Sequence, residues 1–225
     1  MKSFIICLSK IESSLNTALA LKSKLEEFNM PVELFEGTYG NDAIGMMEAE
    51  GRTVHPWGIK GPGNLIDSNH PSFEKLIRPG VKGCFYSHYK LWQKCVELNE
   101  PIIIWEDDIV LTRPFIPVDW GEVLVIALGH QTKSAKYMHL LETPTGVPAA
   151  VEYLQSSMPG CCGYAIKPDA AKKLLAEFHH TYLPADNAIN QYIVNIEIHN
   201  YIMGIALVKK DGKRSLTTNT EIWKI

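Results

Sequence analysis

The stretch from Pro101 to Asp108 constrains the fold more than any other part of the chain. Four apolar residues, 102–105, lead directly into the carboxylates Glu106, Asp107 and Asp108. This pattern is typical of a buried strand in an α/β sheet that presents acidic groups at its carboxyl end. Adjacent carboxylates raise each other's pKa, and hard divalent cations prefer oxygen ligands. The stretch therefore predicts an α/β fold with a divalent cation at the end of this strand.

The rest of the chain alternates between strand and helix patterns. Residues 3–8 and 31–35 are predicted strands, separated by apolar residues at helical spacing: Leu15, Ala18, Leu19, Leu25 and Phe28. Such a unit predicts parallel strands joined by a right-handed crossover. A helix is predicted from Gly83 to just before Pro101, and the later elements are a strand at 122–128, a helix at 147–154, a strand at 163–166, helices at 168–178 and 186–196 and a strand at 201–208. Residues 51–63, and the segment that follows up to Gly80, are predicted loops.

Composition sets limits on domain number and on partners. With 225 residues and 46% hydrophobic content, the chain is long enough for one sizeable core, so residues 1–225 are expected to form a single domain. The net charge of −3 gives no overall electrostatic reason to bind nucleic acid or an anionic membrane. Five cysteines without metal-ligand spacing favour a reduced, cytoplasmic setting. No apolar run approaches the roughly 18 residues of a transmembrane helix, so a soluble protein is expected.

Two motifs taken together resemble the central signature of glycosyltransferase family 25, which includes lipooligosaccharide and collagen galactosyltransferases. The first is Gly-Cys-Phe-Tyr-Ser-His-Tyr-Lys-Leu-Trp at 83–92, and the second is Ile-Ile-Trp-Glu-Asp-Asp at 103–108. Weaker blocks follow the family's order at 4–8, 31–37, 160–166, 170–175 and 184–186. The resemblance implies a GT-A type fold with long active-site loops. It also implies inverting transfer from a nucleotide sugar, with a UDP-hexose favoured, to an acceptor hydroxyl.

The resemblance and the residues together assign a donor site to the acidic stretch. Asp108 is predicted to bind Mn²⁺ or Mg²⁺, and Glu106 to bind the metal or the donor ribose, because alternate residues of an extended strand share a face. Asp107 would support both of them, and it counts with the donor-binding residues. A cation held there would neutralise the charge of the departing diphosphate. The alternative is a solvated acidic strand end without a ligand.

Four further residues are assigned to the donor by resemblance. Leu8 and Ser9 follow the first predicted strand, and Ser87 and His88 lie in the predicted helix before the acidic strand. A hydroxyl and an imidazole could bond the nucleotide or its phosphates. By sequence alone, a hydrogen-bonded core histidine beside apolar helix residues is the favoured explanation of His88.

Asp186 is the candidate general base, because inverting transfer needs a group that takes the proton of the acceptor hydroxyl. An ordinary helix N-cap is the alternative for this aspartate. His199 is a candidate third metal ligand, with a surface histidine as the alternative. Trp57, Lys209 and Lys210 are candidate contacts to the acceptor or the phosphates.

The acceptor and the class of function remain open on sequence grounds. A glycan or lipooligosaccharide is the first expectation. A phage-type DNA glycosyltransferase that acts on a hydroxymethylated base is the second, because lysines such as Lys133 and Lys136 leave local DNA contacts open. A binding module that holds a nucleotide sugar without catalysis is the alternative of another class.

Overall fold

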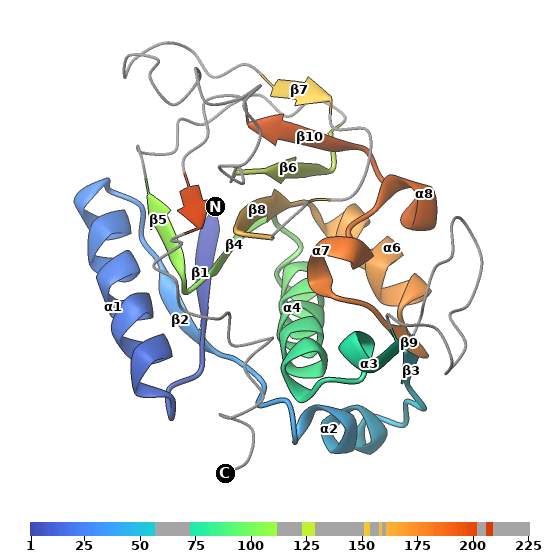
Figure 1. Cartoon of the computed structure of the whole chain (residues 1–225). Coiled ribbons are helices and arrows are strands. Elements are labelled where there is room, and N and C mark those ends of the chain that lie inside the picture. The colour runs from blue at the N-terminus through green and yellow to red at the C-terminus, as the bar shows by residue number, and fades with distance from the viewer. Residues whose placement is uncertain are drawn as a thin grey trace.

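A seven-stranded mixed sheet forms the centre of the computed structural model (Figure 1), which describes residues 1–56, 73–111, 123–128, 151–153, 158, 161–201 and 206–208. The strand order is β2-β1-β4-β8-β6-β10-β7. The strands are β1 (Lys2–Cys7), β2 (Glu33–Glu36), β4 (Ile102–Glu106), β6 (Val125–Ala127), β7 (Val151–Tyr153), β8 (Gly163–Ile166) and β10 (Ile198–Tyr201). Strands β1, β2, β4, β6 and β10 run in one direction, and β7 and β8 run in the other. The described residues therefore confirm an α/β fold with a mostly parallel sheet.

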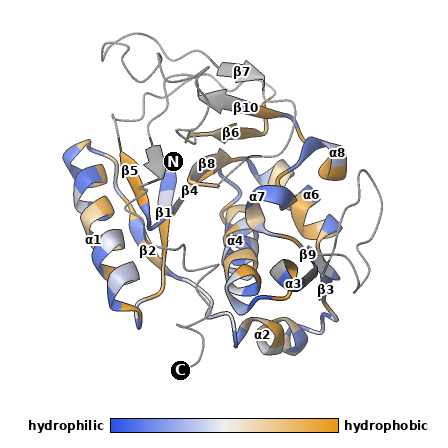
Figure 2. Ribbon diagram, viewed as in Figure 1, coloured by the Kyte–Doolittle hydropathy of each residue, from blue (hydrophilic) through white to orange (hydrophobic). Residues whose placement is uncertain are grey.

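Helices cover both faces of this sheet. Helix α1 (Glu12–Glu27) lies on one face, and α4 (Pro79–Leu98) and α6 (Pro168–Glu177) pack on the other (Figure 1). Because side chains alternate along a strand, Ile103 and Trp105 of β4 join the core under α1, whereas Ile102 and Ile104 join the core under α4. Figure 2 shows hydrophobic colour along β6 and a mixture of hydrophobic and hydrophilic residues along α1. Each face of β4 is thus buried by a different helix.

Smaller elements complete the described fold. The short helices are α2 (Ala43–Ala49), α3 (Phe73–Leu76), α7 (Ala185–Ala188) and α8 (Gln191–Val194). Two small sheets pair β3 (His55–Pro56) with β9 (Thr181–Tyr182), and β5 (Ile109–Leu111) with β11 (Ala206–Val208). No helix in the described part of the chain combines the length and the hydropathy that crossing a bilayer requires.

Helix α4 is fixed by its ends and by one glycine. It begins at Pro79, which suits a first helical position because proline has no N–H to leave unpaired. It ends before Asn99, whose backbone φ of 50° lies in the left-handed region that asparagine tolerates. A Cβ on Gly83 would lie 2.4 Å from the carbonyl oxygen of Thr38, so only glycine allows the helix to approach this loop. The loop after β2 and helix α4 are therefore in close contact below the sheet edge.

Several expectations about elements are corrected. The predicted helix at 147–154 is wrong over residues 151–153, which form strand β7 on the edge of the sheet. The predicted helix at 186–196 is two short helices, because Asn190 takes an extended conformation and its side chain caps α8. The predicted strand at 201–208 is parts of two strands in different sheets. The predicted loops contain β3 at 55–56 and α3 at 73–76.

Candidate active site

The end of β4 lies where the chain changes direction across the sheet. From β1 the chain passes through α1 to β2 on one side, and it later returns to β4 on the other side of β1. In open α/β sheets, ligands bind outside the carboxyl ends of the strands at such a switch point. Glu106 is the last residue of β4 and is paired in register with Ile6 of β1, so Leu8 and Ser9 follow at the same edge. The structure thus brings these two residues and the acidic stretch together.

The carboxylates after β4 face different helices. Glu106 Oε1 lies 3.6 Å from His88 Nε2 and 3.9 Å from Cys84 Sγ, both on α4. Asp107 accepts a hydrogen bond from the Ser14 hydroxyl on α1. Asp107 and Asp108 form a turn between β4 and β5. The expectation that Glu106 and Asp108 share a face of extended backbone is therefore wrong, because the backbone turns directly after Glu106.

Asp186 lies near these carboxylates. Burial raises the pKa of Glu106 well above its ordinary value, and the negative charges of Asp108, Asp186 and Asp107 raise it further. The backbone of Ala185, at the start of α7, is hydrogen-bonded to the Cys84 thiol on α4. We call Glu106, Asp107, Asp108 and Asp186 the acidic cluster. The alternative of an ordinary N-cap for Asp186 is wrong, because Pro184 holds that position and Asp186 lies in the first turn.

Asp107 is held in place by a hydrogen bond, but its partial burial disfavours the charged carboxylate. Burial raises its pKa from an ordinary 3.8 to about 6; the bond from Ser14 lowers the pKa, and the charge of Asp108 raises it. The same Ser14 oxygen accepts a hydrogen bond from the backbone N–H of Leu8 at 2.9 Å. One serine on α1 therefore links the loop after β1 to the turn after β4.

The chemistry of the acidic cluster fits a hard divalent cation. Its ligands are carboxylate oxygens, and a cation would reverse the unfavourable charge that raises the pKa of Glu106. Among the described residues, the metal-ligating atoms that lie within 4.8 Å of one another belong to Cys84, His88 and Glu106. The oxygens of Asp108 and Asp186 are not part of that converging group.

Ser87 and His88 are buried beneath this edge. The Ser87 side chain is 1% exposed; its Oγ accepts a hydrogen bond from the Thr38 N–H at 2.8 Å and donates to the Gly83 carbonyl at 2.7 Å. A direct contact between Ser87 and the nucleotide-sugar donor would require this buried hydroxyl to become accessible. His88 is fully buried and bonds the Tyr164 hydroxyl through Nδ1, as a core histidine does, while Nε2 faces Glu106.

The remaining predicted residues lie elsewhere or outside the described residues. His199 is on β10. Strands β6 and β8 lie between β10 and β4 in the sheet, so His199 is three strands away from β4. Its Nε2 lies 2.6 Å from Glu197 Oε1. The structure does not bring His199 to the acidic cluster. Trp57, Lys209 and Lys210, like Lys133 and Lys136, lie outside the described residues.

Sequence reasoning missed the role of Glu36, which links Tyr39, a candidate platform for a sugar or a base, to the loop that contains Ser9. The Tyr39 hydroxyl accepts a hydrogen bond from the Lys10 N–H at 2.7 Å and donates to Glu36 Oε1 at 3.1 Å. The same Glu36 oxygen accepts from the Ser9 N–H at 3.2 Å. The signal was present in the position of Glu36 and Tyr39 directly after a predicted strand that pairs with β1. These groups border the switch point on the side of β2.

Comparison with known proteins identifies the family of the chain. The model of glycosyltransferase family 25 (LPS biosynthesis protein) matches residues 1–119, which is more than half of the chain and includes α4 and the carboxylates after β4. This chain belongs to glycosyltransferase family 25. Asp186 lies beyond the matched residues.

Two relatives from Haemophilus influenzae are similar to parts of the chain. Lipooligosaccharide biosynthesis protein lex-1, of strain ATCC 51907 / DSM 11121 / KW20 / Rd, is 28% identical over 145 residues, which is 57% of this chain and 47% of that protein. Lipooligosaccharide biosynthesis protein lic2B is 44% identical over 50 residues, which is 21% of this chain and 19% of that protein. The match with each relative spans less than half of that relative's length.

Proposed function

We propose that this chain is a glycosyltransferase that moves a sugar from a nucleotide-sugar donor to an acceptor hydroxyl. The observation that carries this proposal is the acidic cluster at the switch point between β1 and β4, of which Glu106, Asp107 and Asp108 lie within the residues that match the family. Half-buried carboxylates that lie close together at the open edge of a sheet repel one another, and this is costly unless a cation or another ligand offsets their charge. A GT-A type site with a UDP-hexose donor is the form of the proposal that the family favours.

The proposed division of labour follows the contacts of each carboxylate. Asp108 and Glu106 would hold Mn²⁺ or Mg²⁺, whose positive charge stabilises the departing diphosphate. Asp107, hydrogen-bonded to Ser14, would keep the turn in place. The backbone around Leu8 and Ser9 lies at the same edge and would border the nucleotide.

Asp186 is the proposed general base. As the acceptor oxygen attacks the anomeric carbon, its proton would pass to the Asp186 carboxylate while the bond from that carbon to the diphosphate oxygen breaks. Attack opposite to the leaving group inverts the anomeric centre. The proximity of Asp186 to Glu106 supports this role, because base and leaving group must lie on either side of one sugar.

A glycan, such as that of a lipooligosaccharide, is the proposed acceptor. The names of both relatives refer to lipooligosaccharide biosynthesis, and they favour a glycan over a modified DNA base. An acceptor screen that compares oligosaccharides with hydroxymethylated DNA at two salt concentrations separates these classes, since binding to DNA phosphates weakens with salt.

The metal role is tested with Asp108→Ala. This variant should lose cation-dependent transfer or hydrolysis of a nucleotide sugar while its circular dichroism spectrum is unchanged. Asp42→Ala is the matched control, because Asp42 is an exposed carboxylate before α2. Turnover by Asp108→Ala equal to that of the wild type would rule out the metal role.

The base role is tested with Asp186→Asn. Donor binding should persist, whereas kcat should fall about 10²- to 10⁴-fold, the usual effect of removing a general base. Asp169→Asn is the matched control, because Asp169 is an exposed carboxylate in the first turn of α6, as Asp186 is in the first turn of α7. Weakened donor binding with normal kcat would contradict the assignment.

A further inference from the structure

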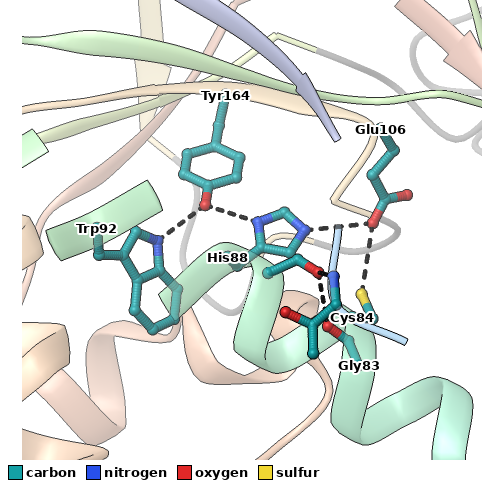
Figure 3. A network of polar contacts seen from close by, with 8 residues as sticks. Gly83, Cys84, His88, Trp92, Glu106 and Tyr164 are labelled. Carbon is teal, nitrogen blue, oxygen red and sulfur yellow. Dashed lines mark hydrogen bonds and ion pairs between the residues drawn. The ribbon is translucent and has the colours of Figure 1, made fainter. Parts of the chain in front are cut away.

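A buried chain of polar side chains leads from the core to the acidic cluster (Figure 3). Trp92 Nε1 on α4 donates a hydrogen bond to the Tyr164 hydroxyl on β8 at 2.8 Å. The same hydroxyl lies 2.9 Å from Nδ1 of His88, one helical turn before Trp92. Nε2 of that imidazole lies 3.6 Å from Glu106 Oε1. Trp92, Tyr164 and His88 are each 0% exposed.

The donors and acceptors of Trp92, Tyr164 and His88 together determine where the protons lie. The indole of Trp92 can only donate, so the Tyr164 oxygen accepts from it. The Tyr164 hydroxyl must then give its own proton to an acceptor, and among the described residues its other hydrogen-bond partner is His88 Nδ1. An imidazole whose Nδ1 accepts a hydrogen bond is not the charged form, so the ring is neutral and carries one proton, in keeping with its complete burial. Because Nδ1 accepts, that proton is on Nε2.

The Nε2 proton is directed at Glu106. Nε2 is buried, and within the described part of the chain it has no hydrogen-bond partner. The 3.6 Å to Glu106 Oε1 is longer than a hydrogen bond, yet this carboxylate is the acceptor that faces the ring. Contacts of this kind are often long without substrate and shorten in the reactive complex.

The same accounting argues against a metal ion held by Cys84, His88 and Glu106. A cation on Nε2 would require the proton to move to Nδ1. The Tyr164 oxygen would then face two donors, Trp92 and His88, and its own buried hydroxyl proton would lose its acceptor. These hydrogen bonds therefore favour a His88 ring that donates its Nε2 proton to Glu106.

We propose that Tyr164 and Trp92 are positioning residues, which hold His88 in the form protonated at Nε2 so that it donates to Glu106 and fixes the orientation of that carboxylate in the donor site. The catalytic consequence rests on the proposed glycosyltransferase function. The proton assignment rests on the hydrogen bonds alone. Tyr164 and Trp92 are both fully buried, so they act through the histidine.

The proton assignment is tested by ¹⁵N NMR of the histidine rings, with the His88 signals assigned by their loss in His88→Gln. In the wild type, Nδ1 should have the shift of an unprotonated nitrogen and Nε2 that of a protonated one. Tyr164→Phe should mix the two forms, because the donor to Nδ1 is gone. Tyr182→Phe is the matched control, because Tyr182 is also buried in the same core but is not one of the residues that connect Trp92 to Glu106. A proton on Nδ1 in the wild type, or unchanged shifts in Tyr164→Phe, would overturn the assignment.

The positioning role is tested by kinetics on the full chain. Tyr164→Phe should lower kcat about 10-fold or more, as is typical when the partner of a site residue is removed, with circular dichroism confirming the fold. In His88→Gln the glutamine amide can offer an N–H in place of Nε2, so adding Tyr164→Phe should then change kcat less than about two-fold. Independent, additive losses would refute action through His88. If the wild type transfers no sugar, the proposed function fails, while the spectrum still decides the proton assignment.

Discussion

Asp107→Asn tests the energetic cost of the acidic cluster. In the folded protein, the pKa of Asp107 is raised from 3.8 to about 6, mainly by burial. At 1.36 kcal/mol per pKa unit, this difference corresponds to about 3 kcal/mol. Asparagine keeps an oxygen that can accept the hydrogen bond from Ser14 but carries no charge. The substitution should therefore remove the charge penalty and keep the link to α1.

The sign of the pH dependence follows from the raised pKa. Below about pH 3, Asp107 is protonated in both the folded and unfolded states and costs nothing. As the pH rises from about 3 to about 7, the unfolded chain loses this proton first, so the wild type loses about 3 kcal/mol of folding free energy. Asp107→Asn lacks this loss. Its stability relative to the wild type should therefore increase by up to about 3 kcal/mol over this range.

The assay is urea denaturation of both proteins at pH 4.5 and pH 7.5 with a chelator present, so that no cation offsets the charge. Asp42→Asn is the control, because this exposed carboxylate should change stability by less than about 0.5 kcal/mol. A difference between Asp107→Asn and the wild type that is the same at both pH values would refute the reasoning.

Two further predictions concern a close approach and a set of buried hydrogen bonds within the fold. Gly163→Ala should destabilise the protein by about 1–3 kcal/mol in urea denaturation, because the new Cβ would lie 2.4 Å from the Trp105 ring; stability equal to that of the wild type would contradict the close approach. Arg52→Lys should cost about 2–3 kcal/mol, because buried Arg52 donates from Nε to the His179 carbonyl and from Nη2 to the Phe178 carbonyl, both at 2.9 Å, and lysine cannot reproduce this fork. A loss below about 0.5 kcal/mol would show that these bonds are replaced by water.

The elements with strong local patterns were predictable from the sequence. The strand before Glu106 and the strand at 163–166 were placed correctly. A short run of apolar residues between turn-forming residues predicts a buried strand without knowledge of its tertiary contacts. The helix from Pro168 was predicted from its proline and its amphipathic spacing. The strand at 151–153 was not predictable, since its pairing with β10 is a contact between distant segments.

The sequence predicted which residues form the acidic stretch, but not how their side chains are arranged. The carboxylates of 106–108 were identified from their position after a buried strand. The turn after Glu106 contains Asp107, which is bonded to Ser14, a residue far away in sequence, and this contact could not be predicted. The role of Tyr164 was hidden because an apolar strand with one tyrosine is typical of a core. The role of its hydroxyl follows from its hydrogen bonds with Trp92 and His88, which only the structure shows.

The most direct test of the central claim is thermal unfolding of the full chain with UDP-hexoses, in the presence and absence of Mn²⁺. A donor at about 100 times its Kd adds about 2.7 kcal/mol to the free energy of unfolding. For a chain of this size, that corresponds to about 5–10 °C in Tm. We expect this shift with Mn²⁺ in the wild type, and its loss without the cation and in Asp108→Ala. Equal shifts with and without Mn²⁺, or no shift with any nucleotide sugar, would contradict a cation-dependent donor site at the end of β4.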